Sequence, residues 1–369
     1  MSWTIPRVYT IGRSPLIEHI THEISKHPKQ PKVPEIVSLL PNEKKFTEFR
    51  NLNSTSTQTI YSNKSASHTS SIQLMSSFQP PIYGNGEYVH IKNLIFHYDK
   101  SSFNHLKTCI KCLDKTSNIL LLNSDKSVLD HLLRTTFNNQ FERPNIFQCL
   151  HDFRLWSNKD FHTNAYGFGG LRLARVPRDL TNKESYDYDL QNNLDRIDLM
   201  KLISEVPSLN SIFLKYNDFA LLQYEHLIVK SSISVFSSLF DVTNGELLQM
   251  HISEPLKKYI KECVKIISST DPIIMGNSFT NTMFDIDRLL DVIFTILKKT
   301  ERDSSTMRIQ FKSFYGDEIN NTCGYFTNLS QRNNVKQNLY NSLYTQLLNA
   351  RLSLKNYRSS KELPLYIEN

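Results

Sequence analysis

The spacing of apolar residues changes about halfway along the chain. In the first half, short apolar runs alternate with segments whose apolar positions recur every three or four residues. This alternation is typical of a parallel sheet connected by crossover helices. The run at 119–123 is apolar on both faces, which favours a central strand. Strands are predicted at residues 7–12, 35–40, 119–123, 145–153 and 170–176, and helices at 16–26, 43–50 and 126–134.

The second half has helical spacing almost throughout. Apolar residues recur at three- and four-residue intervals in 219–240, 254–268, 286–298 and 336–354. The pattern predicts an α/β chain, with a Rossmann-like doubly wound domain at 1–185 and an all-α domain at 186–369. The polar stretch 177–190 is the expected linker. The stretch 51–77, rich in Ser, Thr and Asn, is expected to be a flexible insertion or an irregular hairpin.

Composition indicates a folded chain with an anionic partner. Of the 369 residues, 39% are hydrophobic and 21% are charged, which is ordinary for a globular protein of two domains. The net charge of +7 favours nucleic acid or an anionic membrane surface, without choosing between them. No apolar run approaches the ~20 residues that span a bilayer. There is no secretory signal pattern, and the N-terminal segment leaves little room for a cleavable transit peptide.

The 5 cysteines are few and unevenly spaced, which argues against a disulfide framework. His105, Cys109 and Cys112 form a small group, but no second Cys-x-x-Cys accompanies them. A structural zinc site normally needs four ligands. Because the segment 103–113 also has the spacing of an amphipathic helix, we expect reduced helix cysteines and no metal.

A degenerate dinucleotide-binding turn follows the first predicted strand. Such turns use three glycines, for a tight bend, for close approach to the pyrophosphate and for close helix packing. Only Gly12 remains, because Ser14 and Ile17 stand at the other two positions. Pro15 also removes an N–H that would face phosphate. The lysines at 44–45 could hold a phosphate but equally suit a solvated helical turn, so we expect no bound cofactor.

Residues 305–325 resemble the active-site motif of ketopantoate reductases. The spacing from Met307 to Glu318 matches that motif without a gap. Thr306 replaces the second serine of the motif, and Gln310 replaces its aspartate. The resemblance implies a Rossmann-like domain followed by a helical domain and, in an intact enzyme, NADP-dependent reduction of a 2-oxoacid.

A second block, at 224–248, resembles the catalytic helix of the same family and its downstream Asn-Gly-Glu-Leu. In that family a lysine supplies the proton and polarises the ketone, and an asparagine four residues later helps to bind substrate. Here His226 stands at the lysine position and Lys230 at the asparagine position. A histidine can act as a general acid but is shorter than a lysine, so we expect no catalysis. The vestigial reductase positions are His226, Lys230, Asn123, Asn244, Thr306 and Glu318.

Helix caps or hydrogen bonds between domains would also preserve Asn123, Asn244 and Glu318.

Short runs in the first 150 residues resemble another family, the fungal mitochondrial translational activators of cytochrome b messenger RNA, which themselves have a ketopantoate-reductase-like sequence. These runs occur in order and include 5–9, 30–34, 80–87, 93–95, 118–123 and 143–147.

The resemblance to these activators implies recognition in place of bond-making. It implies a peripheral protein on the matrix side of the mitochondrial inner membrane, acting through the 5′ untranslated leader of the cytochrome b transcript. It also implies contact with the mitochondrial ribosome and with other translational activators. The alternative function is that of an NADP-dependent 2-dehydropantoate 2-reductase.

Two groups of basic residues are candidates for RNA binding. One group recurs every four residues and would form a stripe on a helix that contacts phosphates. The other follows Tyr166 and Phe168, which could stack on single-stranded bases. A lysine stripe is more often a solvated helix face, and such an aromatic pair is more often core. The candidates are Lys257, Lys261, Lys265, Arg172, Arg175 and Arg178.

Overall fold

The computed structural model describes residues 6–26, 36–51, 55–61, 64–70, 73–74, 79–122, 125–159, 161–180, 186–336 and 338–362. It divides into two compact units. The N-terminal unit comprises Met1–Ser124 and Val128–Phe219, and the C-terminal unit comprises Asp125–Ser127 and Ala220–Asn369. The predicted class, an α/β unit followed by a helical unit, is confirmed.

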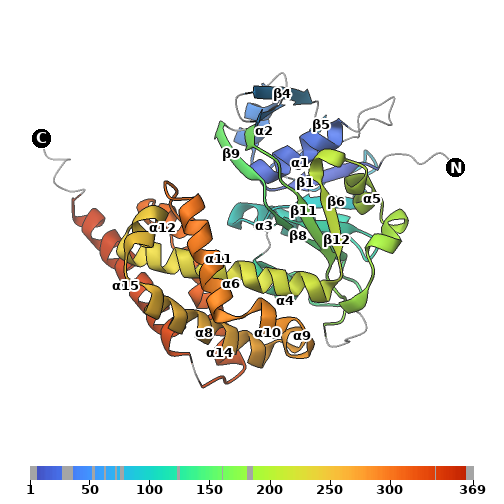
Figure 1. Cartoon of the computed structure of the whole chain (residues 1–369). Helices are drawn as coiled ribbons and strands as arrows, with labels where there is room; N and C mark the ends of the chain where they lie inside the picture. The colour runs from blue at the N-terminus through green and yellow to red at the C-terminus, as the bar shows by residue number, and fades with distance from the viewer. Residues whose placement is uncertain are drawn as a thin grey trace, which may run out of the picture. The chain divides into compact units, whose positions relative to one another are not determined.

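A mostly parallel sheet forms the centre of the N-terminal unit. In the described residues it has eight strands in the order β12-β11-β8-β7-β6-β1-β2-β5. Several of these strands, among them β1, β6, β8, β11 and β12, are labelled in Figure 1. Neighbouring strands are parallel except β8 and β11, which are antiparallel. The strands are β1 (Val8–Ile11), β2 (Ile36–Leu39), β5 (Gln73–Leu74), β6 (Asn93–Phe96), β7 (Asn118–Leu121), β8 (Asn145–His151), β11 (Leu171–Arg175) and β12 (Ser211–Leu214).

Local signals explain where the helices of this unit begin. Ser14 caps α1 and Pro15 occupies its first turn, where a missing N–H costs nothing. Asp99 caps α3 by accepting hydrogen bonds from two main-chain amides. The helix predicted at 103–113 therefore begins earlier, at Lys100, and it ends at Thr108. The helices are α1 (Pro15–Ser25), α2 (Glu43–Arg50), α3 (Lys100–Thr108), α4 (Lys126–Thr135) and α5 (Asp198–Ser204).

A second, smaller sheet covers α1. Its order is β4-β3-β10-β9, and β3 pairs in parallel with β10, with Ser56 opposite His162. The stretch 51–77, expected to be a flexible insertion or an irregular hairpin, contributes β3 and β4, which pair with each other as regular antiparallel strands. Because α1 contacts both this sheet and the main sheet, even polar residues such as His19 and Glu23 are buried on it. The strands are β3 (Thr55–Tyr61), β4 (Lys64–Ser70), β9 (Arg154–Lys159) and β10 (His162–Tyr166).

The prediction that residues 177–190 form a linker is wrong for the residues of this stretch that the structure describes. Tyr186 is buried, and Leu190 joins the apolar core of the N-terminal unit. This unit continues to Phe219, because α5 packs into the same core and β12 extends the sheet. The division between the units thus falls later than the boundary expected after residue 185.

The C-terminal unit is helical in its described residues. Its central helix α6 is buried almost all round, which explains buried serines such as Ser231 and Ser237 among its apolar residues. The four predicted long helices correspond to α6, α8, α11 and α15. The helices are α6 (Tyr216–Phe240), α7 (Asn244–Gln249), α8 (Ser253–Thr270), α9 (Pro272–Gly276), α10 (Thr280–Met283), α11 (Ile286–Lys299), α12 (Thr306–Lys312), α13 (Asp317–Asn321), α14 (Cys323–Arg332) and α15 (Leu339–Glu362).

The cysteines are free and buried. Burial raises the pKa of Cys112 to about 11, so this thiol stays protonated. Within the described ranges, no three His, Cys, Asp or Glu side chains gather in a way that could hold a metal ion, and the expected absence of metal stays a prediction. None of the helices in the described part of the chain has the length and apolar character needed to cross a membrane.

Candidate functional site

The turn after β1 keeps one feature of a dinucleotide-binding turn. Gly12 has φ +97°, and a Cβ added there would lie 2.4 Å from the carbonyl oxygen of His97, so this position requires glycine. Ser14 serves the protein itself, because its Oγ accepts a hydrogen bond from the amide of Ile17 at 3.2 Å. Ile17 is buried in the core of the N-terminal unit.

These residues do not fit the pyrophosphate of a dinucleotide. Pro15 has no N–H to offer, and the amide of Ile17 is already bound by the cap. Glu18 places a carboxylate in the first turn of α1, 3.9 Å from Arg13, where it also accepts a hydrogen bond from Thr163 at 2.5 Å. A carboxylate at the start of a helix repels phosphate from the position that a dinucleotide would use. That no cofactor binds stays a prediction.

A charged cluster in the C-terminal unit contains two of the predicted reductase positions. Lys230, on α6, lies with its Nζ 2.7 Å from the Oε1 atom of Glu318 and 3.0 Å from the Oδ1 atom of Asp125. The side chain of Lys230 is 25% exposed and that of Glu318 is 7% exposed. One ammonium thus lies between two carboxylates at a largely buried position.

The cluster holds its lysine charged. Burial acts to lower the pKa of Lys230, but the charges of Asp125 and Glu318 outweigh it, so this pKa lies above its usual range. Burial raises the pKa of Glu318, and the ammonium of Lys230 opposes this effect. A lysine whose pKa is raised is a poor proton donor near neutral pH. The cluster therefore suits charge pairing better than proton transfer.

The polar residues around Glu318 make hydrogen bonds within the protein itself. Gln310, which replaces the aspartate of the reductase motif, accepts a hydrogen bond from the main-chain amide of Glu318 at 3.0 Å. Asn321 accepts one from the hydroxyl of Ser127 at 2.8 Å. These bonds hold α13 in place, so the environment of Glu318 is fixed without a substrate.

The other reductase positions have different surroundings. His226 is exposed on α6, one turn before Lys230. Asn244 is buried and donates to the hydroxyl of Thr300 at 2.8 Å, which ties the start of α7 to the end of α11. Thr306 is exposed at the first residue of α12. Asn123 lies outside the described residues.

Sequence reasoning missed the acidic partner Asp125 and the neighbouring Lys126. Lys126 Nζ lies 3.8 Å from Asp271, which accepts a hydrogen bond from the hydroxyl of Tyr224 at 2.7 Å. A signal for both was present, because residues 125–126 follow a predicted central strand. The carboxyl ends of parallel strands are where α/β proteins place polar site residues.

The lysine stripe lies on α8 as predicted. Lys261 and Lys265 are exposed, and Lys257 pairs with Asp287 at 3.1 Å. The opposite side of α8 is buried in the helical core. The arrangement is that of an amphipathic helix with a basic outer face, and the role of this face in RNA binding stays a prediction.

The arginine group serves mostly as internal support. Arg178 donates to the carbonyl of Lys115 at 2.7 Å, and both Arg175 and Arg178 donate to Asn145 Oδ1 at 2.9 and 3.2 Å. Arg172 pairs with Asp152 at 3.4 Å. These contacts leave fewer donors for a phosphate, and RNA binding by the group stays a prediction.

The aromatic pair beside the arginines lies on the surface. Phe168 is 89% exposed and Tyr166 is 45% exposed. The alternative in which this pair belongs to the core is therefore wrong. Tyr166 is the last residue of β10, and Phe168 lies in the segment that connects β10 with β11.

Comparison with known proteins gives two kinds of similarity. Residues 218–351 match the family described as ketopantoate reductase PanE/ApbA C terminal. The cytochrome B translational activator CBS2 of Saccharomyces cerevisiae is 27% identical over 359 residues, which cover 90% of this chain and 92% of that protein. A probable 2-dehydropantoate 2-reductase of Schizosaccharomyces pombe is 26% identical over 258 residues, which cover 69% of this chain and 72% of that protein.

A solved structure shows the same fold. The putative 2-dehydropantoate 2-reductase from Enterococcus faecalis superposes with a TM-score of 0.63 at 11% identity, covering 95% of this chain and 99% of that chain. The resemblance expected from the sequence is confirmed: the chain is similar over 90% of its length to a cytochrome B translational activator, and it has the fold of the ketopantoate reductases.

Proposed function

We propose that this protein is a mitochondrial activator of cytochrome b translation that uses a reductase-like fold without reductase catalysis. The extent of similarity carries this proposal. The yeast activator matches 90% of the chain and 92% of its own length, whereas the fission-yeast reductase matches 69% and 72%. Similarity to the activator therefore includes parts of this chain that the reductase does not match.

The geometry of the old reductase positions supports the same proposal. Lys230 is held charged between Asp125 and Glu318, and His226 is exposed at the position of the family's catalytic lysine. The turn at Gly12 does not fit a pyrophosphate. The contacts at the expected cofactor turn and at the expected proton donor therefore support a role without hydride transfer.

The finer parts of the proposal concern location and partners. The protein acts through the 5′ untranslated leader of the cytochrome b transcript, with the mitochondrial ribosome and other translational activators as partners. It works as a peripheral protein on the matrix side of the inner membrane. The net charge of +7 supports a polyanionic partner of this kind.

The test is selective labelling of mitochondrial translation products in cells that lack the gene. Loss of cytochrome b synthesis alone, with its transcript still present, is the expected result. Normal cytochrome b synthesis in those cells would refute the proposal. Cells that make an inactive, unstable variant serve as the control for indirect effects of the deletion.

A second candidate is an NADP-dependent 2-dehydropantoate 2-reductase. The 26% identity to the fission-yeast protein favours it, as does the retention of Glu318. Oxidation of NADPH by the purified protein in the presence of 2-dehydropantoate, together with a pantothenate requirement of the deletion cells, would support this candidate against the first.

A further inference from the structure

A pocket lies at the amino-terminal edge of the main sheet, between the starts of β1 and β6. It has a volume of ≈ 370 Å³ and is lined by residues of the N-terminal unit alone. The turn at Gly12 follows the carboxyl end of β1, so the pocket lies at the opposite edge of the sheet from the degenerate dinucleotide turn. The lining residues are Pro6, Arg7, Tyr9, Tyr83, Val89, His90, Lys92, Asn93 and Asp198.

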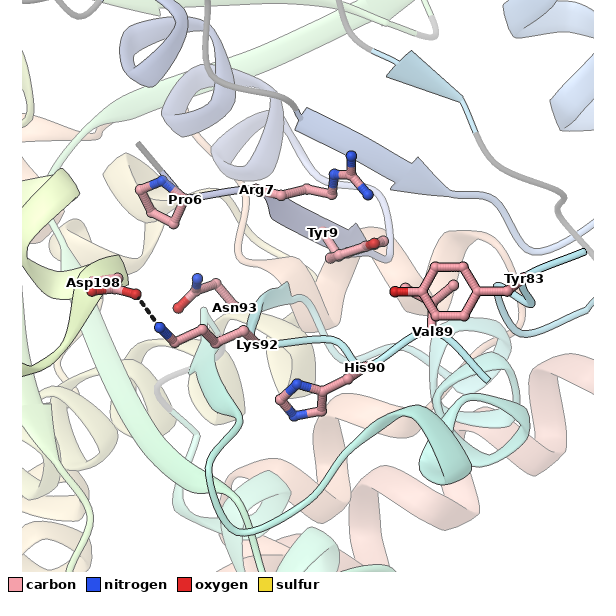
Figure 2. A pocket seen from close by; sticks show the side chains of 9 residues that line it. All are labelled: Pro6, Arg7, Tyr9, Tyr83, Val89, His90, Lys92, Asn93 and Asp198. Carbon is pink, nitrogen blue, oxygen red and sulfur yellow. Dashed lines mark hydrogen bonds and ion pairs between the residues drawn. The ribbon is translucent and has the colours of Figure 1, made fainter. Parts of the chain in front are cut away.

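The floor of the pocket contains a buried amide with an unused donor. Asn93 is 1% exposed, and its Nδ2 atom has no hydrogen-bond partner among the described residues. Figure 2 shows this side chain between Tyr9 and the ion pair of Lys92 with Asp198. A buried amide donor without a partner is costly, so it is expected to meet an acceptor from outside the protein.

A chain of side-chain hydrogen bonds fixes the orientation of that amide. Asn93, Asn118 and Asn145 are in register at the starts of three neighbouring parallel strands. The Nδ2 atom of Asn118 donates to Asn93 Oδ1 at 3.2 Å, and Asn145 Nδ2 donates to Asn118 Oδ1 at 3.2 Å. At the far end, two arginine side chains donate to Asn145 Oδ1.

Arginine can only donate hydrogen bonds, so Asn145 must present its oxygen to Arg175 and Arg178. Its nitrogen then donates to Asn118, whose nitrogen in turn donates to Asn93. The chain therefore leaves the nitrogen of Asn93, and not its oxygen, for the pocket. Hydrogen bonds in such a chain polarise one another, which strengthens the donor at its end.

The rim of the pocket is cationic and aromatic. Arg7 and Lys92 are exposed cationic side chains of the lining, and Lys92 pairs with Asp198. Tyr83 is 56% exposed on the hairpin that faces the pocket, and Tyr88 of the same hairpin has the Lys111 ammonium 5.3 Å from its ring. An aromatic face beside two cations is the combination that binds a base and its phosphate.

We propose that this pocket binds a nucleotide of a single-stranded RNA. The base stacks on Tyr83, the adjacent phosphate contacts Arg7 and Lys92, and Asn93 Nδ2 donates to an acceptor atom of the nucleotide. A pocket of this volume lies in the range of small-ligand sites and suits one nucleotide. A free nucleotide has the same chemistry, and RNA is favoured because this inference rests on the proposed role in translation.

The test measures the fluorescence anisotropy of a labelled single-stranded RNA of about 12 nucleotides with the full chain. Tyr83→Ala is expected to weaken binding about tenfold through lost stacking. Arg7→Gln is expected to weaken binding and to reduce the salt dependence by about one phosphate contact. The matched controls Tyr315→Ala and Arg332→Gln change exposed side chains of the same types in the C-terminal unit and should bind like the unmodified chain.

A separate variant tests the orientation of the Asn93 amide. Asn93→Asp keeps the shape and still accepts from Asn118, but it presents a second acceptor to the pocket in place of the donor. It should weaken RNA binding about tenfold or more. If this variant fails to fold, the two rim variants still decide the proposal, because Arg7 and Tyr83 are exposed.

Four outcomes would overturn the proposal. They are no binding of RNA, binding that neither rim variant changes, equal binding of an abasic oligonucleotide with the same phosphates, and competition by UMP or AMP as effective as by RNA. The last outcome would assign the pocket to a free nucleotide. Failure here is distinct from failure of the proposed function, because cytochrome b synthesis in deletion cells is measured without reference to this pocket.

Discussion

Lys230 holds its ammonium 2.7 Å from the carboxylate of Glu318, and the sequence comparison with the reductase motif predicts both residues as former active-site positions. The reductase motif has an uncharged asparagine at the position of Lys230. Here the ammonium of Lys230 pairs with the carboxylate of Glu318. The same ammonium lies 3.0 Å from a second carboxylate, that of Asp125, so Lys230 forms two ion pairs.

Removing this lysine should destabilise the protein. Lys230→Met leaves two carboxylates close together at a largely buried position, which should lower the free energy of unfolding by about 2 kcal/mol. Adding Glu318→Gln should recover about half of that loss, because it removes one of the unpaired charges. Urea denaturation measures both values. Lys258→Met, at an exposed lysine of α8, is the control and should change stability by less than about 0.5 kcal/mol; an equal loss there would contradict the explanation.

Acid should destabilise the N-terminal unit through His19. Burial lowers the pKa of His19 to about 4, although the carboxylate of Glu23 opposes this shift, and neither ring nitrogen has a hydrogen-bond partner among the described residues. The unfolded chain therefore binds a proton between pH 6.5 and about 4 that the folded chain does not. Stability attributable to this group is present above pH 6.5 and is lost as the pH falls, by about 1.4 kcal/mol per pH unit.

The measurement is urea denaturation at several pH values across that window. His19→Leu stays apolar and does not titrate, so its stability should fall less steeply with acid than that of the unmodified chain. His251→Leu, at an exposed histidine, provides the comparison. Parallel pH profiles for the His19 variant and the unmodified chain would show that other groups cause the acid sensitivity.

Gly12, in the turn after β1, should not tolerate substitution by alanine. In Gly12→Ala the new Cβ meets the carbonyl oxygen of His97 at 2.4 Å, and the residue keeps a positive φ that alanine disfavours. We expect a loss of about 2–3 kcal/mol in the free energy of unfolding. Gly84→Ala is the matched control, since nothing lies within 4 Å of its added Cβ. A loss no greater than that of the control would mean that the turn relaxes easily.

Addition of NADPH should leave the melting temperature unchanged. A ligand that binds the folded state raises stability in proportion to the logarithm of its concentration over Kd, so millimolar NADPH detects even weak binding. Ser14→Gly alone should not create binding, because Pro15 and Glu18 still oppose a phosphate at the start of α1. An active ketopantoate reductase under the same conditions serves as the positive control. A rise of several degrees with NADPH would restore the reductase alternative.

The sequence was sufficient for elements whose signals are local. The apolar run of β7 and the apolar spacing of α6, α8 and α11 can be recognised in the sequence, and Asp285 also caps α11, so the positions of these elements could be predicted. The small sheet could not, because β3 and β10 are polar and far apart in the chain. Their pairing depends on the three-dimensional course of the chain, which no local pattern records.

The candidate sites follow the same division. Lys230 and Glu318 could be named from motif spacing, although their mutual contact could not. The chain of hydrogen bonds through Asn93, Asn118 and Asn145 was not predicted. Neighbouring members of this chain are more than twenty positions apart in the sequence and meet only through the register of the strands. A repeated asparagine at the start of successive apolar runs is the signal that could have revealed it.

The small sheet that covers α1 has a consequence for how the chain folds. β3 is made early in synthesis, but its partner β10 follows only after about a hundred further residues, so contacts of high sequence separation must close last. Until then α1 exposes a surface that the finished protein buries. Nascent or truncated chains that end before Tyr166 should therefore depend on chaperones and aggregate readily, even when every residue of the main sheet's first strands is present.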